Sequence, residues 1–256
     1  MVAIAANSPF FLGKQLWDET RIPLFEQSIN TNLQLAHQRV GFGSAYVKTN
    51  WHEMYQENIK LHQPILPIIA NDENNPFHHI QLHNGTIWRW NRPLIGFDPD
   101  GTAHLRLEHR TCAAGPSIVD NIANIAFYVG LVHYLANLDQ CPEDNLDFKS
   151  ATNNFYNCAQ QGFDAEIKWI DHKTYTITKL LHNLVPVVKQ QLEIIGLDQN
   201  DIDKYIGIID QRIKTRQNGA NWQKAFAQKN NFDMQSLTFA YFNNQRNFQP
   251  VHEWQV

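Results

Sequence analysis

One strand-like segment concentrates the residue types that could do chemistry in this chain. The sequence His104-Leu-Arg-Leu-Glu-His-Arg110 alternates polar with apolar side chains. Successive side chains on a strand point to opposite faces. The polar set that would share one face is His104, Arg106, Glu108 and Arg110. Leu105 and Leu107 would point the other way, and we expect them to face a core.

The charged face would present an acid between two guanidinium groups. Neighbours on one face of a strand lie about 6.6 Å apart, at about 3.3 Å of rise per residue. A carboxylate such as Glu108 suits Mg²⁺, which commonly takes one or two carboxylates together with substrate phosphates. Arginines on either side can bind phosphate or carboxylate oxygens in a bidentate way. An ordinary solvated sheet face has the same pattern, and each of its exposed ion pairs would contribute only about 0–1 kcal/mol.

The neighbouring sequence predicts the element that would position these groups. The segment 86–92, Thr-Ile-Trp-Arg-Trp-Asn-Arg, is rich in residues that favour strands. The segment 98–101, Asp-Pro-Asp-Gly, is a strong turn signal. Together with the charged segment they predict a β-hairpin inside a β region that spans 82–111. The first strand adds Arg89 and Arg92 on opposite faces, so at most one of them joins the charged face unless a bulge intervenes.

The rest of the chain changes from mixed structure to helices. Val2–Ala6 reads as a buried strand, while 15–32 and 51–62 have helical spacing. Ser117 and Asp120 resemble the start of a capped helix that runs to about 137. The apolar stripe of this helix comprises Ile118, Ile122, Ile125, Ala126 and Val129. Helices alone are expected near 143–162, 171–195, 199–217, 220–229 and 233–246, and Pro186 should kink or split the second of these.

This order predicts an α+β fold in which an antiparallel sheet packs against a mainly helical C-terminal block. We interpret residues 1–256 as a single catalytic-domain portion. Residues 1–115 would form a mixed part that contains the substrate-facing sheet, and 116–256 would form the helical block.

Composition excludes several classes of protein. The 256 residues carry a formal net charge of −4, whereas domains that bind nucleic acid are usually basic, so we expect no nucleic-acid partner. No apolar run reaches the roughly 20 residues needed to span a bilayer, and the N-terminal apolar run is too short for a signal peptide. Three cysteines, Cys112, Cys141 and Cys158, have no CxxC spacing. We therefore expect a cytoplasmic protein without a membrane partner.

Several blocks, in order, resemble a known family. The segment 83–93, His-Asn-Gly-Thr-Ile-Trp-Arg-Trp-Asn-Arg-Pro, the charged strand 104–110 and 114–117, Ala-Gly-Pro-Ser, resemble the second glutamate–cysteine ligase family, also called carboxylate–amine ligases. The segment 6–10, Ala-Asn-Ser-Pro-Phe, with Gly13 and the Thr20-Arg21 pair, is similar to an earlier block of the same family.

The resemblance implies an ATP- and Mg²⁺-dependent ligase that forms γ-glutamylcysteine, in glutathione biosynthesis, from glutamate and cysteine through an acyl phosphate. It also implies a saddle-like antiparallel sheet, as in an incomplete glutamine-synthetase-like fold, with ligands on its concave face. Glu108 would be a ligand of the catalytic Mg²⁺, and Arg110 would hold the transferring phosphoryl group or the substrate carboxylate. Arg92 would contact substrate. Three further residues would line the nucleotide or glutamate pocket: Asn7, Ser8 and Arg21.

One departure from the family pattern affects the expected activity. The family carries an early Gly-x-Glu-x-Glu segment that supplies further metal ligands, and this chain has no such segment. Glu19, Glu26 and Glu53 are isolated and do not match it. We therefore expect the C-terminal portion of such a ligase, whose partner would be a missing N-terminal half and which would be inactive alone. The alternatives are a non-catalytic binding module and a ligase with another amine substrate.

Overall fold

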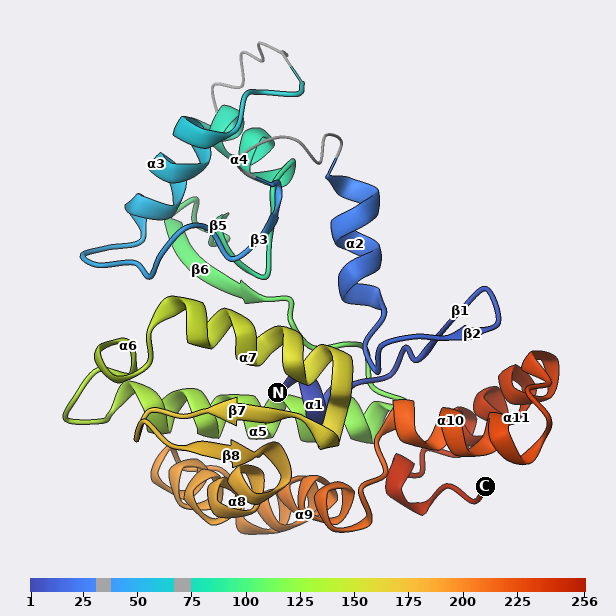
Figure 1. The fold of residues 1–256 in the computed structure, drawn as a ribbon. Coiled ribbons are helices and arrows are strands. Elements are labelled where there is room, and N and C mark those ends of the chain that lie inside the picture. The colour runs from blue at the N-terminus through green and yellow to red at the C-terminus, as the bar shows by residue number, and fades with distance from the viewer. Residues whose placement is uncertain (31–37, 67–74) are drawn as a thin grey trace. The chain divides into compact units, whose positions relative to one another are not determined.

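The computed structural model describes residues 1–30, 38–66 and 75–256, and it has the predicted α+β architecture (Figure 1). The chain divides into two compact units. The helical unit comprises Met1–Ile22 and Cys112–Val256, and the hairpin unit comprises Pro23–Thr111. Residues 1–22 therefore pack with the helical block rather than with the rest of the segment 1–115.

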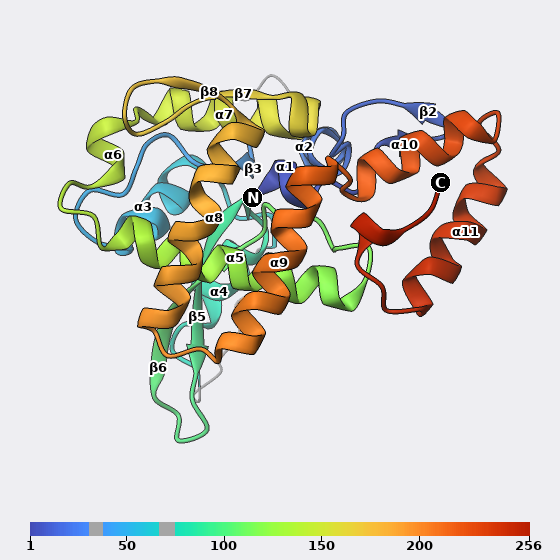
Figure 2. The same ribbon diagram turned by 90° about the horizontal axis from the view of Figure 1, so that it is seen from below.

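Three long helices form the centre of the helical unit. They are α5 (Ile118–Ala136), α8 (Ile177–Ile194) and α9 (Gln199–Thr215), and each packs against the other two (Figures 1 and 2). Gly130 permits the close approach of α5 to α8, because an added Cβ would lie 2.8 Å from Val188. The remaining helices of this unit are α1 (Val2–Ala5), α6 (Pro142–Asn145), α7 (Phe148–Gln161), η1 (Gly162–Asp164), α10 (Gly219–Lys229), α11 (Met234–Arg246) and η2 (Val251–Glu253).

The N-terminal segment differs from the sequence-based expectation at two places. Val2–Ala5 is the short helix α1 and not a strand, and all of its residues are buried. It packs against α7 and α9, and no strand pairs with it among the described residues. The start of the helix expected over 15–32 is not helical. Gln15 belongs to β2 (Lys14–Gln15), which pairs with β1 (Phe10–Phe11) because Leu12 and Gly13, at φ 49° and 75°, turn the chain back.

The helix that does form in this region is α2 (Arg21–Ile29). It begins six residues later than expected, and residues 31 and 32 of the expected helix lie outside the described part of the chain.

The C-terminal block also contains strands, contrary to the expectation of helices alone. Between α7 and α8, β7 (Glu166–Lys168) pairs antiparallel with β8 (Thr174–Thr176). The turn between them is fixed by Asp171, which accepts a hydrogen bond of 2.6 Å from the hydroxyl of Tyr175. Helix α8 therefore begins at Ile177, and it continues through Pro186 without the expected split because α5 and α9 pack along it.

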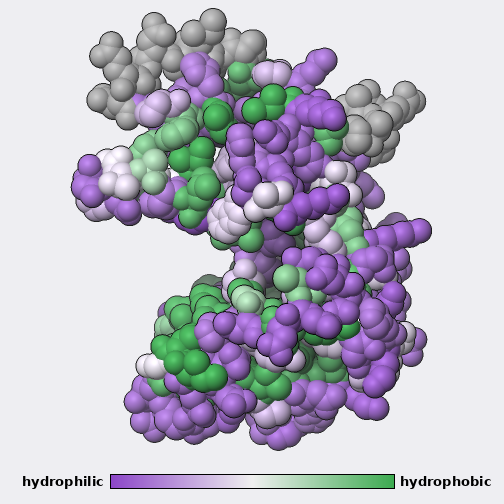
Figure 3. Space-filling model, turned by 90° about the vertical axis from the view of Figure 1, so that its left-hand side faces the viewer, coloured by the Kyte–Doolittle hydropathy of each residue, from purple (hydrophilic) through white to green (hydrophobic). Residues whose placement is uncertain are grey.

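Helix α5 has the predicted boundaries but buries the opposite face from the one its apolar stripe suggests. Ser117 accepts a hydrogen bond from the amide of Asp120, as expected for the cap. The stripe residues Ile118, Ile122, Ile125 and Val129 are 38–60% exposed. The buried face instead carries Asp120, Ala123, Asn124, Phe127 and Gly130. Figure 3 shows hydrophobic residues that reach the surface on one side of the helical unit.

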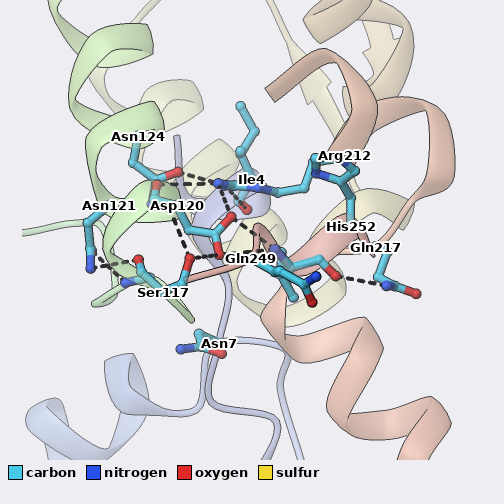
Figure 4. A network of polar contacts seen from close by, with 12 residues as sticks. Ile4, Asn7, Ser117, Asp120, Asn121, Asn124, Arg212, Gln217, Gln249 and His252 are labelled. Carbon is cyan, nitrogen blue, oxygen red and sulfur yellow. Dashed lines mark hydrogen bonds and ion pairs between the residues drawn. The ribbon is translucent and has the colours of Figure 1, made fainter. Parts of the chain in front are cut away.

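A buried ion pair explains why α5 turns its polar side inward (Figure 4). Arg212 of α9 donates to the carboxylate of Asp120 at 2.8 Å and to the amide oxygen of Asn124 at 2.7 Å. Both members of the ion pair are at most 1% exposed. The carboxylate of Asp120 also accepts from the backbone amide of Val251 at 3.1 Å, which ties the C-terminal segment to α5.

By length and composition alone, α5 is also apolar enough to cross a membrane. Helix α5 packs on α8 and α9 and buries Asp120, but only 28% of its most apolar stretch is buried.

The hairpin unit is built from two helices and short strands. These elements are α3 (His52–Leu61), α4 (His78–Gly85), β3 (Val40–Gly41), β4 (Trp88–Arg89), β5 (Asn91–Phe97) and β6 (Ala103–His109). Strands β5 and β6 form the predicted antiparallel hairpin, while β3 and β4 pair in parallel. Helix α4 occupies the start of the expected β region, since the side chain of Asn84 anchors it by donating to the carbonyl of Pro93 at 2.7 Å. The core of this unit includes the fully buried Trp90.

The second face of the hairpin is not the buried surface that the alternation suggested. Leu105 and Leu107 are 54% and 41% exposed. Among the described residues the strands form four two-stranded sheets and not one saddle-shaped sheet. Within the described part of the hairpin unit, no further layer covers these leucines.

Candidate active site

Three charged side chains meet on one face of the β5–β6 hairpin. The strand register places Arg92 directly opposite Glu108. Nε and Nη2 of Arg92 each lie 2.9 Å from Oε2 of Glu108. Nε of Arg110 lies 3.4 Å from the same oxygen. We refer to Arg92, Glu108 and Arg110 as the hairpin charge cluster.

The two arginines lie on different strands, Arg89 on β4 and Arg92 on β5, and not on opposite faces of one strand as expected. Arg92 joins the charged face, whereas Arg89 is 3% exposed and points into the unit. There it donates to the carboxylate of Glu57 at 2.8 Å and to the side chain of Asn58 at 2.7 Å. Arg106 lies on the same face as Glu108, as predicted, but it does not flank this carboxylate. Its guanidinium lies 3.4 Å from Nε2 of His104 instead.

An aromatic stack fixes the position of Arg110. The guanidinium carbon of Arg110 lies 3.2 Å from the centroid of the Trp88 ring, a cation–π contact. Trp88 in turn contacts Phe25, with 4.3 Å between ring centroids. The Arg110 side chain is only 14% exposed, so it presents its charge from a partly desolvated and rigid position.

The electrostatics of the hairpin charge cluster favour anions. Two guanidinium groups flank one carboxylate, which leaves a net positive charge on the cluster. The side chain of Glu108 is 38% exposed, so a ligand can reach the cluster from solvent. A phosphate or carboxylate can accept forked hydrogen bonds from either arginine, and charge-assisted bonds of this kind are about twice as strong as neutral ones.

The other predicted site residues form a separate cluster in the helical unit. The hydroxyl of Ser8 accepts from the backbone amide of Arg21 at 3.1 Å and so caps the start of α2. The side chain of Arg21 donates to the carboxylate of Glu19 at 2.9 Å. Glu19 is 1% exposed and also accepts from the backbone amide of Asn7 at 2.9 Å. Sequence reasoning treated Glu19 as isolated, although the Glu19-x-Arg21 spacing could have indicated this pair.

Asn7 has its side chain fully engaged within the unit. Its Nδ2 donates to the carbonyl of Ala114 at 2.9 Å and to the hydroxyl of Tyr241 at 2.8 Å. Its Oδ1 accepts from Gln223 at 3.0 Å. Burial raises the pKa of Tyr241 to about 12, so this hydroxyl stays neutral. Asn7 therefore joins the N-terminal segment to α10 and α11, and its predicted contact with substrate stays a prediction.

The described residues do not by themselves fit a magnesium ion. Glu108 is the one carboxylate of the hairpin charge cluster, and its Oε2 already accepts from two guanidinium groups. Among the described residues there is no group of three or more His, Cys, Asp or Glu side chains that could hold a metal ion. The role of Glu108 as a magnesium ligand therefore stays a prediction.

A partly desolvated pair of arginines around one accessible carboxylate suits the binding of phosphate or carboxylate groups. The model of the glutamate–cysteine ligase family 2 matches residues 1–241, and the chain belongs to this family. Membership confirms the predicted resemblance and implies a carboxylate–amine ligase. Ligases of this family generally use ATP and Mg²⁺. No curated protein matches the chain.

Proposed function

We propose that the chain takes part in an ATP-dependent ligation that joins the γ-carboxylate of glutamate to the amine of cysteine. ATP would phosphorylate the carboxylate, the amine would attack the acyl carbon, and phosphate would leave. The products would be γ-glutamylcysteine, ADP and phosphate, in the cytoplasm and toward glutathione. Family membership supports the reaction class.

The observation that carries the proposal is the hairpin charge cluster. The cluster lies on β5 and at the end of β6, within the family-like segments, and its two guanidinium groups flank a carboxylate that is 38% exposed. Phosphoryl transfer depends mainly on positioning and on stabilisation of negative charge. Arg110, held by Trp88, would bind the phosphoryl group, and Arg92 would bind substrate.

The carboxylates that complete a metal site would come from outside this cluster. We propose that an N-terminal half with a Glu-x-Glu segment supplies them, either in the same gene or as a separate chain. An in-frame Glu-x-Glu segment in the DNA upstream of codon 1 would support this arrangement.

A coupled assay of ADP release tests the proposal. The chain, alone and with its N-terminal half, would be given ATP, glutamate and a panel of amines that includes cysteine. Arg110→Gln should lower the rate about 100-fold, the typical loss for one preorganised donor. Arg106→Gln is the matched control, because it removes an exposed guanidinium from the same strand and should change the rate less than twofold. No ADP release with any amine, or equal loss in the two variants, would refute the ligase assignment.

Glu108 has a test of its own. Calorimetry should show that Glu108→Gln weakens the binding of Mg-ATP but not that of ATP without metal. This substitution removes the charge and keeps the shape, so equal weakening in both titrations would count against a metal role.

A non-catalytic binding module is a second candidate, and the exposed leucines favour it. Leu105 and Leu107 are exposed apolar residues on the hairpin face opposite the charge cluster, which has a single carboxylate. Such a module would bind nucleotide or a partner protein. It would release no ADP with any amine, even when the N-terminal half is present. The same coupled assay therefore separates the two candidates.

A further inference from the structure

Two polar side chains hold the ring of His109 at the end of strand β6. Nδ1 of His109 lies 3.0 Å from Oδ1 of Asn91, and Nε2 lies 2.7 Å from the hydroxyl of Thr111. An amide oxygen can only accept a hydrogen bond, so Nδ1 carries the proton and donates to Asn91. In the neutral ring Nε2 then accepts from the hydroxyl of Thr111. We refer to these three residues as the His109 network.

The His109 network alternates with the hairpin charge cluster along the chain. Asn91 precedes Arg92 on β5, and His109 lies between Glu108 and Arg110. The strand register pairs Asn91 with His109, and the next pair is Arg92 with Glu108. Successive side chains on a strand point to opposite faces, so the ring of His109 lies on the face opposite the charges.

Arg110 is the member of the hairpin charge cluster that lies beyond the paired strands. Strand β6 ends at His109, and the backbone amide of Arg110 donates to the carbonyl of Trp90 at 2.9 Å. The ends of secondary-structure elements open more readily than their middles. The bond between His109 and Thr111 joins the residues on either side of Arg110. The bond from His109 to Asn91 ties this short segment to β5.

Thr111 gives the segment a fixed end. It is 5% exposed, and it is the last residue of the hairpin unit. A buried hydroxyl that loses its partner gains no bond to water in return, so such a bond is costly to break. The backbone around Arg110 therefore cannot move away from His109 without breaking a buried hydrogen bond.

We propose that His109 is a positioning residue for the binding of anions. Through Asn91 and Thr111 it fixes the backbone from which the Arg110 guanidinium reaches a phosphoryl group. Its ring does not touch the ligand, because it lies on the other face of the hairpin. The inference rests on the proposed function, since the anion is the phosphoryl group of that reaction.

Calorimetry with inorganic tripolyphosphate tests this role on the full chain. His109→Phe keeps a ring and removes both hydrogen bonds. It should weaken tripolyphosphate binding roughly 10-fold in protein that remains folded, because a donor displaced by about 1 Å fits its acceptor poorly. Thr111→Val removes only the hydroxyl, so it is a milder variant and should weaken binding about 2- to 3-fold. The double variant should lose no more than His109→Phe alone, and additive losses would contradict a route from Thr111 through His109.

The NMR resonance of the Arg110 Nε–H group reports the position of the guanidinium without any ligand. The Trp88 ring lies 3.2 Å from the guanidinium carbon, so its ring current shifts this resonance in the wild type. His109→Phe should move the resonance toward that of an unstacked arginine. A role in stability alone would lower the free energy of unfolding and leave both the resonance and the tripolyphosphate affinity unchanged.

His104→Phe is the matched control. His104 lies on the same strand, and its ring contacts Asp98 at 3.3 Å and Arg106 at 3.4 Å. This variant should change tripolyphosphate affinity less than twofold and leave the Arg110 resonance in place. Unchanged affinity and resonance in His109→Phe, or equal changes in the two variants, would overturn the positioning role. A wild-type chain that bound no tripolyphosphate would overturn the proposed function, and the Arg110 resonance would still decide whether His109 positions this side chain.

Discussion

Arg212→Met should strongly destabilise the helical unit, because it leaves a buried carboxylate without its counter-charge. Arg212 is 1% exposed and Asp120 is 0% exposed. The substitution roughly keeps the side-chain length and removes the bonds to Asp120 and Asn124 at 2.8 and 2.7 Å. The loss of one partner from a buried ion pair typically costs about 3–5 kcal/mol. That amount is a large fraction of the stability of a domain, which is about 5–15 kcal/mol.

Urea unfolding followed by tryptophan fluorescence would measure this loss. Trp222 and Trp254 lie in the core cluster that contains Val251, and the amide of Val251 donates to Asp120. The variant should therefore also show faster hydrogen exchange at the amide of Val251, because a freed Asp120 carboxylate would reorganise.

An exposed pair of the same residue types supplies the control. Arg216 contacts Asp164, and their side chains are 45% and 80% exposed. Exposed pairs contribute about 0–1 kcal/mol, so Arg216→Met should have a small effect. An equal loss in the free energy of unfolding for Arg212→Met and Arg216→Met would contradict this reasoning. The buried ion pair would then not explain why the polar side of α5 faces the core.

Three smaller predictions concern other residues. Burial raises the pKa of Cys158 to about 11, so at pH 8 roughly 0.1% of it is thiolate, and a thiol reagent should modify the exposed Cys141 first and Cys158 only on unfolding. Backbone amides, above all that of Lys48, lower the pKa of Glu53 to about 2. The stabilisation that these bonds give should be complete above the unfolded pKa of about 4.3 and lost as the pH falls through 2, which carboxyl titration by NMR would show. Leu105→Ser should change the free energy of unfolding by less than about 0.5 kcal/mol, because this side chain is 54% exposed, and a loss of several kcal/mol would contradict the exposed face.

Local patterns predicted the hairpin and most of its charge cluster. The turn 98–101 and the alternation along β6 are properties of adjacent residues, and they placed Glu108 and Arg110 on one face before any tertiary contact was known. The pattern did not show that Arg89 and Arg92 would lie on two separate strands, β4 and β5. It could not show that Trp88 would stack on Arg110, because side-chain packing between strands depends on geometry beyond the alternation rule.

Long-range pairing explains the predictions that were wrong. The buried face of α5 depends on Arg212, which is 92 residues from Asp120 in the sequence. A hydrophobic stripe on a helix predicts the buried face only if no buried charge lies on a neighbouring element. Here Arg212 is such a charge, and Asp120 on the polar side of α5 is its partner. In the same way, Val2–Ala5 has the residues of a buried strand but becomes a helix beside α7 and α9.

The sequence by itself determined the α+β order, the charged hairpin and the family, because all three follow from residues that are neighbours or nearly so. The tertiary structure alone decided which faces are buried. It also decided that Asn7 and Ser8 hold the chain together. These features depend on contacts between residues far apart in the chain, and local periodicity carries no information about such contacts.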